Sequence, residues 1–480
     1  MIEPKSTPAV GIGMLVKWCY PLLVLALSQY AFAACQGIKG PLRVHSANGR
    51  YFTDDGVRAV YLTGSHTWAN VPAIGPEDPP LPLDFGRYYL PWIESYDHNF
   101  ARLWAWELTV WDTRWNHPTQ NRRQIHKAHT VAPHPWERSG PGSALDGKPK
   151  FDLKNYNPEY FDRLRTIVKQ ACDRGVYVSV MLFEGWGIRK EGAWERHPFH
   201  PKNNVDGLNG DVDGDGKGVE IHTLVNPSVK VVQEAYVKKV IDTINEFDNV
   251  LFEISNEMHY TSSEWQYSMI RLIHAYEKTK PKQHPVGMTI QYPGGTHETL
   301  FRGPADWISP SSKDGYKDEP PASDGTKVIL NDTDHLWGIG GNEKWVWKTF
   351  VNGMNPIFMD PYDGEVLGEP FDPRWDAVRL NMGYTRKYAE KMSLAAMTPR
   401  GNLSSTKYCL ANPGAEYLVY SPTSTSFTVD LSSAKDRMQL EWFDPATGRV
   451  YARGESEGGR VVEFRVPFRG SAVLYLYTRN

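Results

Sequence analysis

Short apolar segments alternate with longer amphipathic segments along most of the chain. Short apolar runs are typical of strands buried on both faces, and a 3.6-residue apolar period is typical of helices that cover them. Asn157-Pro158 and Asn226-Pro227 each place an N-cap before a proline, which predicts two helix starts. Eight strands are predicted, at residues 59–64, 99–107, 176–183, 249–256, 286–291, 305–309, 327–332 and 356–360.

This alternation predicts a (β/α)₈ TIM barrel over residues 40–400 rather than an open doubly wound sheet. No Gly-x-Gly-x-x-Gly motif follows an early strand, which argues against a dinucleotide site. From residue 416 onward, short β-rich runs are separated by turn sequences such as Asp444-Pro-Ala-Thr-Gly448. We therefore expect a small C-terminal all-β sandwich over residues 405–480.

The first residues have the pattern of an export signal. Lys17 precedes an apolar run from Tyr20 to Leu27 that is too short to span a bilayer, and Ala31-Phe-Ala33 fits a cleavage site. We expect residues 1–34 to be a signal peptide and the protein to be secreted or periplasmic, with no membrane span.

Cysteine usage leaves two questions open. Cys35 follows the predicted cleavage site, so a lipid anchor at Cys35 is the alternative to free secretion, which is favoured because Phe32 stands where lipoprotein signals prefer Leu. Cys35, Cys172 and Cys409 remain after the leader, and their odd count indicates no particular pairing.

Composition narrows the class of partner. The 480 residues carry a net charge of -3, so there is no basic footprint and no nucleic-acid partner is expected. The 17 Trp and 25 Tyr are numerous, and aromatic faces are common platforms for sugar rings as well as core fillers. The sequence does not indicate an oligomeric state.

A carboxylate stands at the end of the fourth predicted strand. Glu257 follows Asn256 there, and the carboxyl ends of barrel strands form the face where active sites are built. A carboxylate at such a place is costly to keep for packing alone. Hydrolysis of a glycoside needs two carboxyl groups, one of which gives a proton. We therefore predict that Glu257 is that acid and that Asn256 binds a sugar hydroxyl.

The sequence resembles the clan A glycoside hydrolases. Phe252-Glu253-x-x-Asn256-Glu257 matches the motif that carries their acid/base on strand four, and Arg102 on strand two matches the Arg that steadies their nucleophile. The segment from Glu416 onward resembles a module named for collagen binding, which often follows apiosidase-like barrels. The resemblance implies a secreted glycosidase that acts on an oligosaccharide or polysaccharide and requires no cofactor for catalysis.

The seventh strand departs from that clan. In the clan, the nucleophile on this strand is a Glu, whereas here the strand ends Leu330-Asn-Asp-Thr-Asp-His335. Asp332 is therefore the predicted nucleophile, and Asp334 is the alternative. Asp is shorter by one methylene, about 1.5 Å of covalent reach. Retaining enzymes hold their carboxyls about 5–5.5 Å apart and inverting ones about 6.5–9.5 Å. Retention is favoured narrowly, and inversion stays open.

Other residues near predicted strand ends are expected to bind the sugar. Glu107 and Glu184 could instead replace Asp332 as the partner of Glu257, and Glu253 is expected to pair with Arg102 inside the barrel. The predicted substrate-binding residues are Asn256, Arg102, His66, Trp68, Glu107, Glu184, Trp186, Asp334, His335 and Trp337.

The run Asp211-Val-Asp-Gly-Asp-Gly216 resembles the start of a calcium loop. Asp211, Asp213 and Asp215 are the predicted ligands of a structural Ca²⁺, with an Asx-rich turn as the alternative. The twelfth position is His222 instead of the bidentate Glu of an EF-hand, and Glu220 could substitute in a looser loop.

Two other functions remain open. One is a non-catalytic surface protein that binds glycan or matrix through the barrel mouth and the sandwich. The other is a metal-dependent hydrolase that uses Asp332, Asp334 and His335.

Overall fold

The computed structural model describes residues 34–112, 128–362, 371–423 and 425–478. Eight parallel strands form one sheet in the order β3-β15-β14-β13-β12-β11-β10-β5. Their bounds are β3 (Gly64–His66), β5 (Phe100–Leu103), β10 (Tyr177–Glu184), β11 (Val250–Asn256), β12 (Val286–Thr289), β13 (Trp307–Ser309), β14 (Val328–Asp332) and β15 (Asn355–Met359).

The first and last strands of this order meet, so the sheet closes into a barrel. The backbone N–H of Asn99 donates to the carbonyl of Thr63 at 3.0 Å, just before β5 and β3 begin. Gly64 makes the approach possible, because a Cβ there would lie 1.8 Å from the carbonyl oxygen of Phe100. The predicted TIM barrel is confirmed.

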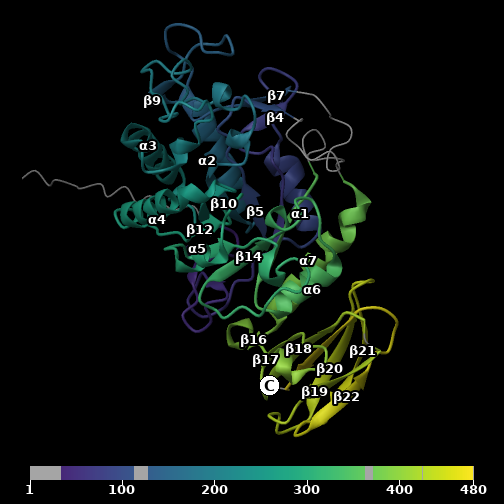
Figure 1. Ribbon diagram of the computed structural model, residues 1–480. Helices are drawn as coiled ribbons and strands as arrows, with labels where there is room; N and C mark the ends of the chain where they lie inside the picture. Colours follow the sequence, from purple (N-terminus) through teal and green to yellow (C-terminus); the bar gives the residue numbers. More distant parts are fainter. Residues whose placement is uncertain (1–33, 113–127, 363–370, 424, 479–480) are drawn as a thin grey trace, which may run out of the picture. The chain divides into compact units, whose positions relative to one another are not determined.

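Seven α-helices accompany the strands in the part of the chain described (Figure 1). They are α1 (Leu90–Ser95), α2 (Pro158–Cys172), α3 (Pro227–Ile244), α4 (Ser263–Glu277), α5 (His297–Arg302), α6 (Glu343–Val351) and α7 (Asp376–Lys391). Both predicted N-caps are confirmed, because the side chains of Asn157 and Asn226 accept backbone N–H groups of α2 and α3. Short helical segments are η1 (Phe85–Tyr89), η3 (Gly187–Arg189), η4 (Trp194–Arg196), η5 (Val219–His222), η6 (Tyr260–Ser262), η7 (Lys313–Gly315), η8 (Thr333–His335), η9 (Pro373–Trp375), η10 (Leu394–Ala396) and η11 (Gly401–Leu403).

Small sheets lie outside the barrel. A hairpin of β1 (Arg43–Val44) and β2 (Phe52–Thr53) precedes the barrel. The long segment after β5 contains further strands. They are β6 (Val110–Asp112) and β7 (Ala128–Ala132), which form a sheet with β4 (Ala73–Gly75), and the pair β8 (Trp136–Glu137) and β9 (Asp152–Tyr156).

Two barrel strands, β3 and β5, differ from their predicted bounds by more than two residues. The apolar run before β3 is held by other partners, since the N–H of Val60 donates to Phe52 and that of Leu62 to the side chain of Asn355. Barrel pairing therefore starts only at Gly64, and it includes His66, two residues beyond the predicted end of the strand. β5 ends at Leu103 because the next N–H, of Trp104, donates to the side chain of Asn70.

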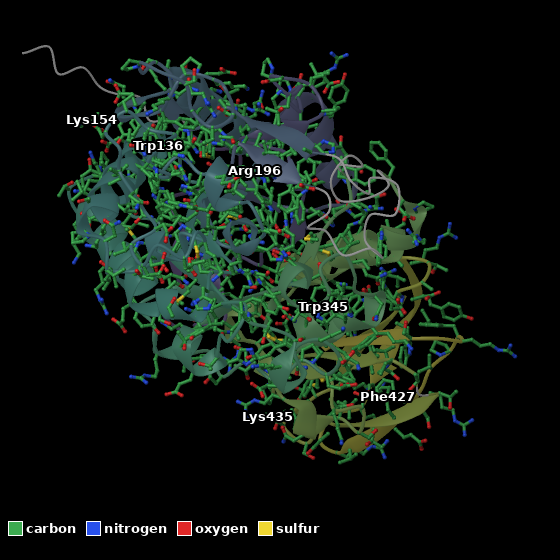
Figure 2. The ribbon with its side chains drawn as sticks, turned by 45° about the horizontal axis from the view of Figure 1, so that its top comes forward. Trp136, Lys154, Arg196, Trp345, Phe427 and Lys435 are labelled. Carbon is green, nitrogen blue, oxygen red and sulfur yellow. A yellow bond between two sulfur atoms is a disulfide. The ribbon has the colours of Figure 1, made fainter. Side chains whose placement is uncertain are left out.

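The C-terminal strands form an antiparallel six-stranded sheet and a two-stranded sheet, as the sandwich prediction requires. They are β16 (Thr398–Pro399), β17 (Cys409–Asn412), β18 (Glu416–Ser421), β19 (Ser426–Asp430), β20 (Met438–Asp444), β21 (Arg449–Ser456), β22 (Val461–Arg465) and β23 (Ala472–Tyr477). Phe427 of β19 lies among the packed side chains of this domain (Figure 2). Trp347 of α6 stacks on Tyr420 of β18, so barrel and sandwich share an aromatic contact.

A disulfide joins Cys35 to Cys172 at the end of α2, and Cys409 is buried and free. The sequence had indicated no pairing. A Cys35 sulfur bonded to Cys172 is not available for a lipid thioether, so the disulfide and the lipid anchor exclude each other in one molecule. Residues 1–33 of the predicted leader lie outside the described residues. Among those described, no helix is both long and apolar enough to cross a bilayer.

Candidate active site

A cavity of about 620 Å³ opens at the carboxyl ends of the barrel strands. Glu184 and Glu257 line it at the ends of β10 and β11, and Asp334 lines it just after β14. Trp68, Trp104, Trp106, Trp186 and Trp337 form much of the remaining wall. The cavity thus combines carboxyl groups with broad aromatic faces, which are the two features that a sugar site needs.

Glu257 is held in an unusual backbone conformation at the first position after β11. Its φ is 44°, a left-handed value that few non-glycine residues adopt and that costs energy unless the surroundings impose it. The pKa of Glu257 is raised, chiefly by burial and next by the negative charge of Asp334, while Arg189 opposes the rise. A raised pKa keeps the carboxyl protonated toward neutral pH, as a proton donor requires.

Asp332 and Asp334 have different surroundings. Asp332 ends β14 beneath the cavity, where its Oδ1 accepts from His66 Nε2 at 3.0 Å and from the backbone N–H of Asp334. Burial alone would raise the pKa of Asp332, yet His66 and Arg102 hold it below its usual range. Asp334 lies on η8 and lines the cavity itself. The structure therefore places Asp334, and not the predicted Asp332, where a second carboxylate could reach a substrate.

Arg102 ties these groups together from β5. Its Nε and Nη2 donate to the two oxygens of Glu253 at 2.8 and 2.6 Å, which confirms the predicted pair. Nη2 also donates to Asn256 Oδ1 at 2.7 Å, and Nη1 donates to Asp334 Oδ2 at 2.9 Å. Arg102 is only 3% exposed and does not line the cavity, so it holds the site's residues in place instead of binding sugar as predicted.

The orientation of Asn256 is fixed by a chain of hydrogen bonds. Its Oδ1 accepts from Arg102 and also from His335 Nε2 at 3.1 Å. Burial lowers the pKa of His335 to about 4, so the ring is neutral, and its Nδ1 accepts from Ser309 Oγ at 2.8 Å. Since the oxygen of Asn256 is occupied, its amide N–H groups remain to donate into the cavity that it lines.

Two residues predicted to contact sugar are buried elsewhere. Glu107 lies beyond the end of β5, where its oxygens accept from His222, His197 and the backbone N–H of Glu184. It does not line the cavity. His66 is fully buried between Asp332 and the indole N–H of Trp104, which donates to its Nδ1 at 2.9 Å. The structure does not bring these two side chains to the cavity, because they satisfy other buried groups.

Glu184 does line the cavity, and burial raises its pKa to about 8, with Glu107 adding to the rise and the backbone N–H of Gly187 opposing it. The predicted Trp68, Trp186, His335 and Trp337 also line it. Sequence reasoning missed Tyr292, Lys313 and Lys317, which lie on loops after β12 and β13. The sequence signal that could have identified these residues is their position on loops that follow predicted strands.

The predicted metal loop gathers a different set of carboxylates. Ligand atoms of Asp211, Asp213 and Glu220 lie within 4.8 Å of one another. Asp215 instead pairs with Lys217 at 2.5 Å. The looser loop with Glu220 therefore fits a hard cation better than the three Asp residues do.

Calcium binding to this loop stays a prediction with a thermal test. A cation that binds only the folded state stabilises it by about 2.7 kcal/mol at a hundredfold excess over Kd. We expect calcium to raise Tm by a few degrees, and Asp213→Asn to remove this response. Equal melting of wild type in calcium and in chelator would show that the loop is an Asx-rich turn.

A metal centre at Asp332, Asp334 and His335 is not favoured by the contacts there. Among the residues described, no cluster with metal-ligand spacing includes them. The guanidinium of Arg102 lies within 4.0 Å of both aspartates, in the place that a cation would need. The metal-dependent alternative therefore loses its support.

Comparison with known proteins adds independent information. Residues 95–292 match a family model described as "Domain of unknown function (DUF6298)", and residues 397–473 match "Putative collagen-binding domain of a collagenase". No curated protein matches the chain.

Solved structures resemble most of this chain. A glycoside hydrolase family 5 structure from Bacteroides vulgatus has 13% identity and a TM-score of 0.58, covering 92% of this chain and 94% of its own. A second Bacteroides vulgatus structure, described as a "putative glycoside hydrolase", has 13% identity and a TM-score of 0.60, covering 92% of this chain and 82% of its own. The fold is shared. At this identity, the likeness by itself shows nothing more.

Proposed function

We propose that the protein is a secreted glycoside hydrolase of the clan A type that cleaves an oligosaccharide or polysaccharide with two carboxyl groups. The observation that carries the proposal is the pairing of Glu257, whose pKa is raised, with Asp334, which Arg102 holds, across one Trp-lined cavity. The family 5 likeness of the fold and the resemblance of the Asn256-Glu257 motif add support.

Glu257 acts as the general acid and Asp334 as the nucleophile in this proposal. An oxygen of Asp334 attacks the anomeric carbon while Glu257 gives its proton to the glycosidic oxygen. The bond between the anomeric carbon and the glycosidic oxygen breaks, and the leaving sugar departs as an alcohol. Water then gives a proton to Glu257 and attacks the same carbon, which releases Asp334. The amide of Asn256 donates to the hydroxyl beside the reacting carbon.

The proposal includes retention of configuration. Arg102 stabilises negative charge on Asp334 in the way a nucleophile requires, and the backbone turn into η8 brings the short side chain to the cavity. Time-resolved NMR of the first product anomer tests this point directly. An inverted first product would assign Asp334 the role of a base that activates water.

Activity should follow a bell-shaped pH profile. Asp334 must be ionised and Glu257 protonated, so activity falls as pH rises through the raised pKa of Glu257. We expect the alkaline limb of kcat/KM to lie well above the ordinary glutamate value of about 4.3. Arg189→Ala should move this limb further up, because Arg189 opposes the rise. An alkaline limb that does not respond to Arg189 would contradict the assignment.

Export is part of the same proposal. The disulfide between Cys35 and Cys172 suits an oxidising compartment, and the leader pattern of residues 1–34 agrees with it. A screen of plant and bacterial polysaccharides for new reducing ends tests the activity. Binding of glycans without any product release would instead favour a non-catalytic glycan-binding protein.

A further inference from the structure

Cationic side chains without acidic partners surround the cavity. Lys313 and Lys317 line it on the loop after β13, and neither forms an ion pair with any residue that the structure describes. The neighbouring Asp314 is engaged by His297 at 2.7 Å. Lys317 is half-buried, and its Nζ lies 5.1 Å from the ring centre of Trp337, which also lines the cavity.

A second pair of cations, Arg189 and Lys190, follows β10; neither lines the cavity itself, but each packs against a ring that does. The Nζ of Lys190 lies 3.6 Å from the ring centre of Trp186, and the guanidinium of Arg189 lies 5.2 Å from that of Tyr292. Nε of Arg189 donates to the carbonyl of Gly185, but its Nη2 is buried with no hydrogen-bond partner in the described chain. A buried donor of this kind is costly unless a ligand satisfies it.

The acidic side chains of the cavity do not neutralise the charge of these cations. Asp334 is already paired with Arg102, and the raised pKa values of Glu184 and Glu257 mean that neither is a full negative charge at neutral pH. Lys313 and Lys317 are not among the main charges that shift the pKa of Glu257. An uncompensated cationic lining attracts negatively charged ligands.

We propose that the substrate is an acidic saccharide, whose carboxylate or sulfate groups are bound by Lys313 and Lys317, while Arg189 adds positive charge beside Tyr292 of the cavity wall. The sugar rings stack on Trp186 and Trp337 beside these cations. This inference rests on the proposed function, because it names the class of saccharide that the same cavity cleaves.

The test measures binding to the Glu257→Gln protein by calorimetry, so that turnover does not interfere. The probes are trigalacturonate with its carboxyl-reduced form, and a sulfated galactan oligosaccharide with its desulfated form. We expect at least one acidic probe to bind about 10-fold more tightly than its neutral form, with an affinity that falls as salt rises. Preferential binding of trigalacturonate would identify carboxylate as the recognised group, and preferential binding of the sulfated galactan would identify sulfate.

Charge substitutions locate the effect. K313A/K317A should weaken binding of the acidic probe about 10-fold, because it removes two positive charges from the cavity, and should leave binding of the neutral probe within about twofold. K313R/K317R should restore most of the affinity. The matched control is K344A/K435A, which removes two exposed lysines that form no ion pair with the described residues and lie outside the cavity lining. Lys435 lies in the C-terminal domain (Figure 2).

Three results would overturn the inference: neutral probes bind as tightly as acidic ones, neither acidic probe binds, or the control and test variants lose affinity for the acidic probe equally. Failure of the inference is distinguishable from failure of the proposed function. Fast cleavage of a neutral glycan, unaffected by K313A/K317A, would support the proposed hydrolase and contradict the acidic substrate. If an acidic probe binds through the two lysines but the wild type releases no product, the binding of acidic saccharides would be supported and the proposed hydrolase contradicted.

Discussion

Glu257→Gln is expected to lower kcat/KM on a natural glycan by about 10²- to 10⁴-fold, the usual contribution of a positioned acid. The amide cannot give a proton to the leaving sugar, although it keeps the shape of the side chain. Binding should change little, because Asn256 and the Trp faces remain. The measurement is kcat/KM and Kd for wild type and variant on the same substrate.

A second substrate separates proton donation from a general loss of structure. An aryl glycoside with an acidic leaving group needs little protonation, so its first, bond-breaking step should be far less impaired in Glu257→Gln. The alkaline limb of the pH profile should also disappear. Glu264→Gln, an exposed position on α4, is the matched control. Equal losses on both substrates, with the alkaline limb intact, would show that Glu257 is not the acid.

Asp334→Asn is expected to abolish turnover, with a loss of about 10³-fold or more, because an amide cannot form the glycosyl intermediate. Its Tm should change little, since Arg102 keeps its two bonds to Glu253. Kinetics and thermal melting of the same preparation check both statements.

Asp332→Asn is the informative partner of that experiment. Asp332 is buried against His66 and Arg102, and breaking such a pair costs about 3–5 kcal/mol. We expect a clear drop in Tm and a smaller loss of activity, about 10²-fold, through misplacement of the site. Full activity in Asp334→Asn together with none in folded Asp332→Asn would return the role to Asp332.

The barrel could be predicted from the sequence because its signals are local. The apolar run that became β11 and the Asn-Pro starts of α2 and α3 each specify their element without help from distant residues. The start of β3 could not be predicted, because Val60 and Leu62 are held by Phe52 and Asn355. Such side-chain and hairpin partners are invisible in a hydrophobic pattern.

The candidate site shows the same division. Glu257 and Asn256 could be found because they directly follow a well-marked strand, and Glu253 because its spacing turns it toward Arg102. The choice between Asp332 and Asp334 depends on where the chain leaves β14 and turns into η8. Sequence periodicity places both aspartates on one face, and only the turn moves one of them to the cavity.

Release of new reducing ends by wild type and by a Glu257→Gln/Asp334→Asn double variant, purified in the same way, tests the two-carboxylate claim most directly. We expect measurable turnover of at least one glycan by wild type and none by the double variant, which should still bind that glycan. Equal release by the two proteins, or glycan binding by wild type with no release, would contradict it.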